Sequence, residues 1–226
     1  MLPDGIGSSV AHPRGKASPL KKSETRFSLD TWRVHVDADH LDEKAKRIIA
    51  AAFELAQSGG FDAVRLRDVA RRSGVALGTL YKRFRSKEDI LVGALELLAK
   101  RYEEGDLTTR IGGATTEDRV VNLLTTLTDA MFSSPNFAKA LLRAVASGAP
   151  SVAEKVGAYR GRMTGLILQS MQVHGDDERA MRVAVILQHV WFAAMVGWMS
   201  GLRDEEGIIE ELRPTVQLLL EGSNAS

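Results

Sequence analysis

The chain contains no cysteine among its 226 residues. Disulfide bonds, thiolate metal sites and a cysteine nucleophile are therefore excluded. Aromatic side chains are also few, with three Trp, three Tyr and seven Phe. The five His lack the spacing of metal ligands. The sequence therefore predicts no metal site and no other cofactor.

Long apolar segments are missing as well. No stretch of 18 or more residues is both apolar and free of charges, and the N-terminus lacks the apolar segment of a signal peptide. The most apolar region is 178–201, where Gln188 and His189 are the only strongly polar residues between Val183 and Met199. A helix that is apolar on every side is buried on every side. We therefore expect a cytoplasmic protein without a membrane partner, in which this helix packs on its own core and on a second subunit.

Positive and negative charges nearly balance over the whole chain, which has a net charge of +1. The distribution is uneven, however. Residues 41–90 carry 11 Lys and Arg against 7 Asp and Glu, whereas residues 91–226 carry 13 against 17. Phosphate contacts would need the basic excess of the first region. The acidic remainder argues against a second nucleic-acid site.

Apolar residues recur with helical spacing through most of the chain after residue 40, and no strand pattern or internal repeat is present. The sequence therefore predicts an all-α fold. Pro214 should kink the last helix or mark its boundary. Residues 1–40 are rich in Gly, Pro and Ser and predict a disordered extension, although a basic arm on DNA is an alternative. Helices are expected at 43–58, within 66–87 as a short pair, from 86 to about 106, from 116, from 135, and at 151–174, 178–201 and 205–221.

The region 66–87, LRDVARRSGVALGTLYKRFRSK, contains two short helices joined by a tight turn. Ala70 is small enough to lie where the two helices cross. Gly74 tolerates the positive φ that the turn requires. Leu80 is an apolar residue that can hold the second helix on the first. This spacing predicts a helix-turn-helix, whose second helix enters the DNA major groove. An ordinary helical hairpin is the alternative, and the surrounding Arg and Lys residues favour DNA.

The segments LRDVA at 66–70, GVALGTLYKRF at 74–84 and SKED at 86–89 resemble the TetR family of bacterial transcriptional regulators. The resemblance implies an N-terminal domain at 41–102 with a three-helix helix-turn-helix, followed by a ligand-binding and dimerisation domain at 103–226. The forms VALGTLYKRF and VWFAAMVGWM are similar to KstR-type repressors of actinobacterial sterol catabolism. This likeness implies a large apolar effector, such as a sterol-derived or fatty acyl-CoA.

The resemblance also implies which residues contact DNA. Tyr81 and Lys82 would lie on phosphates or base edges, Thr79 on a phosphate or a thymine methyl group, and Lys87 on a phosphate. Packing is the alternative role for Tyr81. The candidate DNA contacts are Arg65, Arg67, Leu77, Gly78, Thr79, Tyr81, Lys82 and Lys87. Arg65 and Ala76 stand where relatives often have Ser or Thr, and Arg83 is also unusual, so the operator sequence is not predicted.

Candidates for an effector pocket are large apolar residues of the C-terminal region, together with one amide. Met and Trp make adaptable walls for a bulky ligand, although an ordinary core is the alternative for each residue. The pocket candidates are Phe132, Leu141, Met163, Ile167, Met171, Gln188, Trp191, Phe192, Met195 and Trp198. The candidates for the dimer interface are Val216, Leu219 and Leu220.

The sequence contains no phosphate loop, paired-His motif or serine elbow, which argues against an enzyme. The function predicted is that of a homodimeric repressor released from palindromic double-stranded DNA by an apolar effector. The long helix that begins near Ser86 would act as the lever between the two domains. Two alternatives stay open: a ligand-sequestering protein with an inactive DNA-binding head, and an activator.

Overall fold

The computed structural model describes residues 43–104, 111–173 and 176–221, with only the backbone for 99–104. The regular elements of these ranges are all helical, which confirms the predicted all-α fold. The extension expected at 1–40 lies outside the described residues. The elements are α2 (Glu43–Ala63), α3 (Leu66–Ser73), α4 (Leu77–Arg83), α5 (Lys87–Glu104), α7 (Thr116–Phe132), α8 (Pro135–Ala146), the 3₁₀ turn η1 (Pro150–Val152), α9 (Ala153–Ser170), α10 (Glu178–Met199) and α11 (Glu205–Glu221).

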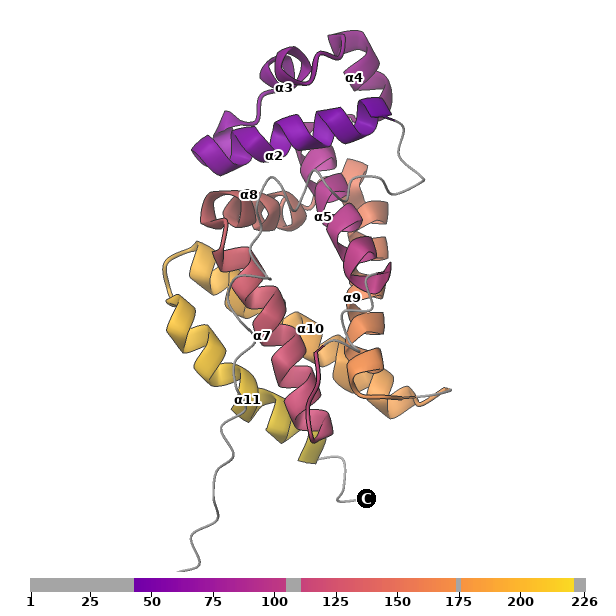
Figure 1. The fold of residues 1–226 in the computed structure, drawn as a ribbon, viewed down its shortest axis with the longest axis vertical. Coiled ribbons are helices and arrows are strands. Elements are labelled where there is room, and N and C mark those ends of the chain that lie inside the picture. The colour runs from indigo at the N-terminus through magenta and orange to yellow at the C-terminus, as the bar shows by residue number, and fades with distance from the viewer. Residues whose placement is uncertain (1–42, 105–110, 174–175, 222–226) are drawn as a thin grey trace, which may run out of the picture.

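Helices α2, α3 and α4 form a head at one end of the molecule (Figure 1). Helix α5 leaves the head and runs down among the remaining helices, where it packs on α8 and α9. Helix α8 lies directly beneath α2, and α7, α10 and α11 form the opposite end. The head therefore sits on the rest of the protein through α2 and α5.

Helix α2 extends beyond the predicted end at residue 58, but its backbone breaks where the sequence indicates. Gly59 has φ −144° and Gly60 has φ 68°, neither of which is helical, and Phe61 to Ala63 add a further turn. Gly60 supplies the positive φ that a residue with a side chain adopts only with strain. The turn places Phe61 beside the start of α5.

The contact between head and body is apolar at its centre. Phe53 of α2 is fully buried, and its ring centroid lies 4.4 Å from that of Phe137 on α8 in an edge-to-face arrangement. Burial of such a side chain contributes about 1.5–3 kcal/mol. The core consequently continues from the head into the body without a polar layer between them.

One predicted boundary is wrong. Helix α9 ends at Ser170 rather than near residue 174, since Gln172 adopts the left-handed conformation with φ 57°. Helix α11 spans Glu205–Glu221 as predicted, and it continues through Pro214, which therefore marks no boundary. A proline removes one helical hydrogen bond, and Pro214 lies on the exposed face of α11, where water can satisfy the carbonyl left without that bond.

Helix α7 is tied to α11 at its first turn. The Thr115 hydroxyl accepts a hydrogen bond from the Asp118 backbone N–H at 3.0 Å, and the Asp118 carboxylate accepts one from Thr115 N–H, forming a capping box. Arg213 of α11 donates to Glu117 at 2.6 Å and to Asp118 at 3.1 Å. The Thr115 side chain and, after it, Arg213 lower the pKa of Asp118 below its ordinary value of 3.8.

Replacement of this cap tests its contribution to stability. We expect Thr115→Ala to lower the free energy of unfolding by about 1 kcal/mol at neutral pH, as for other N-caps. Because the cap depresses the pKa of Asp118 in the folded state, its contribution is present above about pH 4 and is lost as pH falls through the folded pKa. Urea unfolding of both proteins at several pH values measures this. An equal difference at pH 7 and pH 2 would contradict the link to Asp118.

Candidate functional site

The turn between α3 and α4 has the geometry that the motif predicts. Gly74 has φ 64°, and its N–H reaches the carbonyls of Ala70 and Arg71 at the end of α3. The Val75 N–H donates to the Ala70 carbonyl at 3.2 Å. Leu80 is fully buried, so the apolar side of α4 faces α2 and α3. The opposite side of α4 is thereby turned outward.

The outer face of α4 holds most of the predicted DNA contacts. Tyr81 is 52% exposed, which rules out packing as its role in the monomer. Lys82 and Gly78 are exposed, whereas Leu77 and Thr79 are half-buried. A Cβ on Gly78 would meet no atom within 4 Å, so a ligand can approach this point closely. This face therefore presents the Lys82 ammonium, the Tyr81 hydroxyl and the accessible backbone at Gly78.

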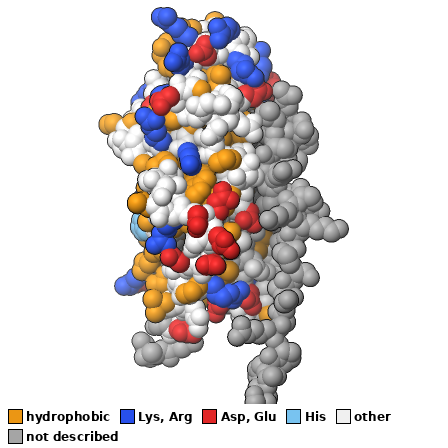
Figure 2. Space-filling model, turned by 90° about the vertical axis from the view of Figure 1, so that its left-hand side faces the viewer, with side chains coloured by type: hydrophobic (Ala, Val, Ile, Leu, Met, Phe, Trp, Pro, Cys, Tyr) orange, Lys and Arg blue, Asp and Glu red, His pale blue; other side chains and the backbone are white. Residues whose placement is uncertain are grey.

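The arginines of the head fall into two groups. Arg71 pairs with Asp68 at 2.7 Å, and Arg72 pairs with Glu54, so both have partners within the head. Arg65 and Arg67 are exposed, and Arg65 is the N-cap of α3 without a side-chain cap hydrogen bond. Figure 2 shows Lys and Arg gathered over the head and acids concentrated over the body. The face of the head seen in this view is therefore largely positive.

Lys87 is less accessible than the sequence suggests. Its ammonium donates to the Phe61 carbonyl at 3.3 Å, lies 3.8 Å from the centroid of the Phe61 ring and lies 3.8 Å from the Asp62 carboxylate. Arg143 of α8 contacts the same carboxylate at 3.1 Å. Asp62 and Arg143 were not among the predicted site residues, and no spacing rule links positions so far apart.

The predicted pocket residues lie in a packed core. Leu141, Ile167 and Met195 are fully buried, and most of the others are nearly so. The two polar groups among them are satisfied: Gln188 donates to the Arg160 carbonyl at 3.0 Å, and Trp191 donates to the Thr128 hydroxyl at 2.8 Å. The structure therefore brings these residues together from α7 to α10, but in a closed arrangement.

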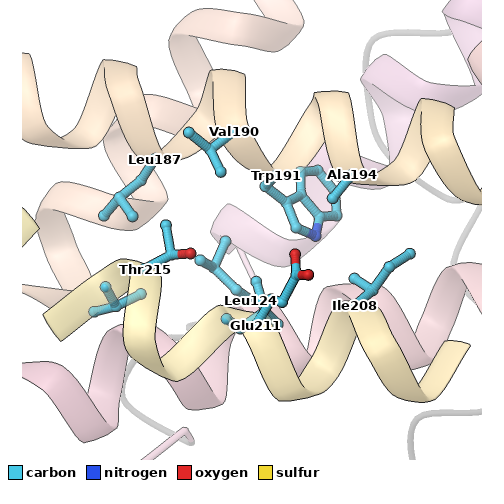
Figure 3. Close-up of a pocket in the computed structure, with 10 residues that line it drawn as sticks. Leu124, Leu187, Val190, Trp191, Ala194, Ile208, Glu211 and Thr215 are labelled. Atoms are coloured by element: carbon cyan, nitrogen blue, oxygen red, sulfur yellow. The ribbon is translucent and has the colours of Figure 1, made fainter. Parts of the chain in front are cut away.

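A hollow of about 330 Å³, which includes space open to solvent, lies between α10, α11 and α7 (Figure 3). Trp191 is the single pocket candidate that lines it. Val190 and Ala194 of α10 and Glu211 and Thr215 of α11 form other parts of its wall. The hollow is a surface groove between two helices and differs from the predicted pocket.

One predicted interface residue requires correction. Val216 is fully buried within the protein's own core, so it is unavailable to a second subunit. Leu219 and Leu220 are partly buried, and Leu218 between them and Val216 is 73% exposed. The apolar stripe that the sequence suggested for α11 is the inner face of the helix. The outward face was missed because a single exposed Leu gives no periodic signal.

Substitution of the two lysines tests the interface. We expect Lys82→Ala and Lys87→Ala each to weaken binding to duplex DNA of any sequence and to flatten the plot of log affinity against log salt by about one unit, as for lost phosphate contacts. Fluorescence anisotropy over a salt series measures the slope. Lys139→Gln on α8, an exposed lysine of the body, is the control with an unchanged slope. A wild-type slope for Lys87→Ala would assign that lysine to the Phe61 contacts alone.

Residues 48–94 match the family model of bacterial regulatory proteins of the tetR family, and residues 113–219 match that of the tetracyclin repressor-like C-terminal domain. The chain is similar to the HTH-type transcriptional repressor KstR of Rhodococcus jostii, with 34% identity over 90% of this chain and 95% of the relative. It is also similar to KstR of Mycobacterium tuberculosis, with 29% identity over 79% of this chain and 81% of the relative.

Solved structures share the fold. A TetR transcriptional regulator from Rhodococcus sp. RHA1 superposes with a TM-score of 0.72 at 23% identity, covering 81% of this chain and 97% of the other. FadR from Bacillus subtilis in complex with stearoyl-CoA gives a TM-score of 0.56 at 19% identity, covering 78% and 97%. The arrangement of head and body therefore occurs in other proteins of known structure.

Proposed function

Because the chain belongs to the TetR family of bacterial regulatory proteins, we propose that it is a homodimeric repressor that leaves its operator when a large apolar effector binds. The observation that carries this proposal is the outward face of α4 with Tyr81 and Lys82, on a basic head. Two such helices in one dimer would enter successive major grooves of palindromic DNA, about 34–36 Å apart or somewhat more. The protein would act in the cytoplasm, where the DNA is.

The dimer would form through α10 and the neighbouring face of α11. Helix α10 is long and apolar enough to cross a membrane by length and composition, yet one side of it is buried in the body by residues such as Leu187 and Trp191. Its other side exposes Ile186 and Val190, which are 44% and 42% accessible. These two residues are four apart and lie on one helical face. Leu218 on α11 is the most exposed large apolar residue of that helix.

A charge on the outward face tests this interface. We expect Val190→Glu to give a monomer, because a carboxylate would be buried without a partner in the dimer. Helical content and thermal unfolding of the subunit should change little, since Val190 is partly exposed. Analytical ultracentrifugation and circular dichroism measure both. Val216→Glu is the matched comparison and should unfold the subunit, because that position is fully buried. A stable Val190→Glu dimer would remove this face from the interface.

The effector would be a large apolar metabolite such as a fatty or sterol-derived acyl-CoA. The name of one structural neighbour records a complex with stearoyl-CoA, and the curated relatives are KstR repressors. Met163 of α9 and Met195 of α10 are buried in the core, where flexible thioethers can rearrange around an acyl chain. Because both residues are packed in the core in this structure, binding of an acyl chain beside them would require α9 and α10 to separate.

Separation of α9 from α10 would move the head through α5. Helix α5 packs on α2 in the head and on α8 and α9 in the body, so a shift of the body helices is carried along one rigid element. Such a shift would change the spacing between the two recognition helices of the dimer. Effector and operator would then oppose each other through a difference in affinity for two conformations.

Selection from a random duplex library tests DNA recognition, and addition of stearoyl-CoA to the selected complex tests the effector class. We expect enrichment of a palindrome and an affinity at least about tenfold lower with the acyl-CoA, a coupling within the range usual for allosteric effectors. Native mass spectrometry of the dimer measures acyl-CoA binding independently.

Failure to enrich any sequence would support a sequestering protein with an inactive head. A palindrome whose complex tightens with acyl-CoA would contradict release by the effector.

A further inference from the structure

The C-terminal end of the recognition helix is held by one carboxylate. Asp89, in the first turn of α5, is only 4% exposed. One of its oxygens accepts the backbone N–H of Arg85 at 2.8 Å, just beyond the end of α4. Its own N–H donates to the Ser86 hydroxyl at 3.2 Å. Asp89 therefore fixes the turn that joins α4 to α5.

The counterion of this carboxylate comes from the body of the protein. Lys155 of α9 donates to the other oxygen of Asp89 and forms an ion pair with it. The same ammonium lies 5.1 Å from the centroid of the Phe84 ring, the C-cap residue of α4. Lys155 thus contacts both residues that end the recognition helix and begin α5.

The pair resists separation because it is largely enclosed. The side chains of Asp89 and Lys155 are 6% and 31% exposed. Withdrawal of the lysine would leave a buried carboxylate without a counterion, which is strongly unfavourable. Gly93 of α5 lies beside the pair, since a Cβ there would be in ordinary van der Waals contact with Phe84 at 3.4 Å and with the Lys155 ammonium at 4.0 Å. Displacement of the start of α9 is therefore opposed unless the α4–α5 turn moves with it.

A second ionic contact between head and body is weaker. Arg143 of α8 pairs with Asp62 at 3.1 Å, but the two side chains are 55% and 77% exposed. Exposed pairs are screened by water and salt and contribute little. The Asp89–Lys155 pair is the more enclosed of these two contacts.

Helix α9 connects this pair to the region proposed for the effector. Lys155 and Met163 lie eight residues apart on the same 18-residue helix, a distance of about 12 Å along its axis. Met163 and Ile167 are buried, and α9 packs on α5, α10 and α7. A rigid helix therefore carries the pocket candidates at its middle and the counterion of the head at its start.

From these contacts we propose that Lys155 and Asp89 are positioning residues that couple α9 to the recognition helix, so that separation of α9 from α10 by an effector reorients the head. This inference rests on the proposed function for its biological role, but the coupling itself is a property of the free protein. Lys155 acts through Asp89 and Phe84 and does not contact DNA. Loss of the pair should widen the range of orientations that the head adopts on the apolar core it shares with the body.

The test measures the orientation of the head directly. The chain has no cysteine, so Arg71→Cys in α3 and Glu206→Cys in α11 give two unique spin-label sites on exposed residues. Double electron–electron resonance on labelled protein, diluted with unlabelled protein, gives the distribution of distances within one subunit. We expect Lys155→Met to broaden this distribution about twofold, since the buried carboxylate loses its counterion. Lys155→Arg should retain the narrow distribution because it restores the pair.

Two further variants keep the outcome clear. Asp89→Asn removes the buried charge but keeps an acceptor for the Arg85 N–H. We expect it to broaden the distance distribution as well, so it provides the test if Lys155→Met does not fold. Arg182→Gln breaks an exposed pair with Glu178 on α10 and should leave the distribution unchanged. Distributions as narrow as wild type in folded Lys155→Met or Asp89→Asn would overturn the proposal.

Binding to the selected palindrome then separates this inference from the proposed function. We expect Lys155→Met to lower the affinity about tenfold, a change equal to roughly 1.4 kcal/mol, and Lys155→Arg to restore it to within about threefold of wild type. If wild-type protein selects no DNA sequence, the proposed function fails while the resonance measurement still decides the coupling. A broadened distribution with unchanged operator affinity would overturn the role of the pair in positioning the head.

Discussion

Helix α5 packs on the head and on the body at once, and the rest of the structure depends on this constraint. Its first turn closes the helix-turn-helix through Asp89, and the buried residues Ile90 and Leu91 follow immediately. Further along, the helix packs on α8 and α9. Because Phe53 and Phe137 extend the same apolar core, the head cannot tilt without a change in packing below it. Control of DNA binding from the body therefore requires a switch between two packed arrangements rather than a flexible joint.

The two ionic contacts between head and body differ in solvent exposure and therefore in strength. The exposed pair of Arg143 and Asp62 can exchange its partners with water, and Asp62 also lies near Lys87, a candidate phosphate contact. The enclosed pair of Asp89 and Lys155 has no such freedom. DNA phosphate could compete for the first pair, whereas a displacement of α9 acts on the second. Under the proposed function, the first contact would respond to DNA binding and the second to effector binding.

The sequence predicted the helices and the motif well because each depends on local rules. Gly74 and Leu80 act within a few residues, and their positions in the structure agree with the spacing. The roles of Lys87 and Val216 were harder, since burial depends on partners far along the chain. Periodicity marked Val216 as apolar but could not say whether its own core or a second subunit covers it. The Asp89–Lys155 pair joins residues 66 positions apart, and no local sequence pattern predicts a contact over that separation.

The most direct test of the central claim, a repressor head positioned for DNA by the body below it, is a hydroxyl-radical footprint of the full-length protein on the DNA upstream of its own gene. The account predicts protected tracts on one face of the duplex, related by a dyad and separated by about one helical turn or a small multiple of it, as expected for two recognition helices in successive major grooves. Uniform weak protection, or no protection at protein concentrations that saturate the dimer, would contradict it.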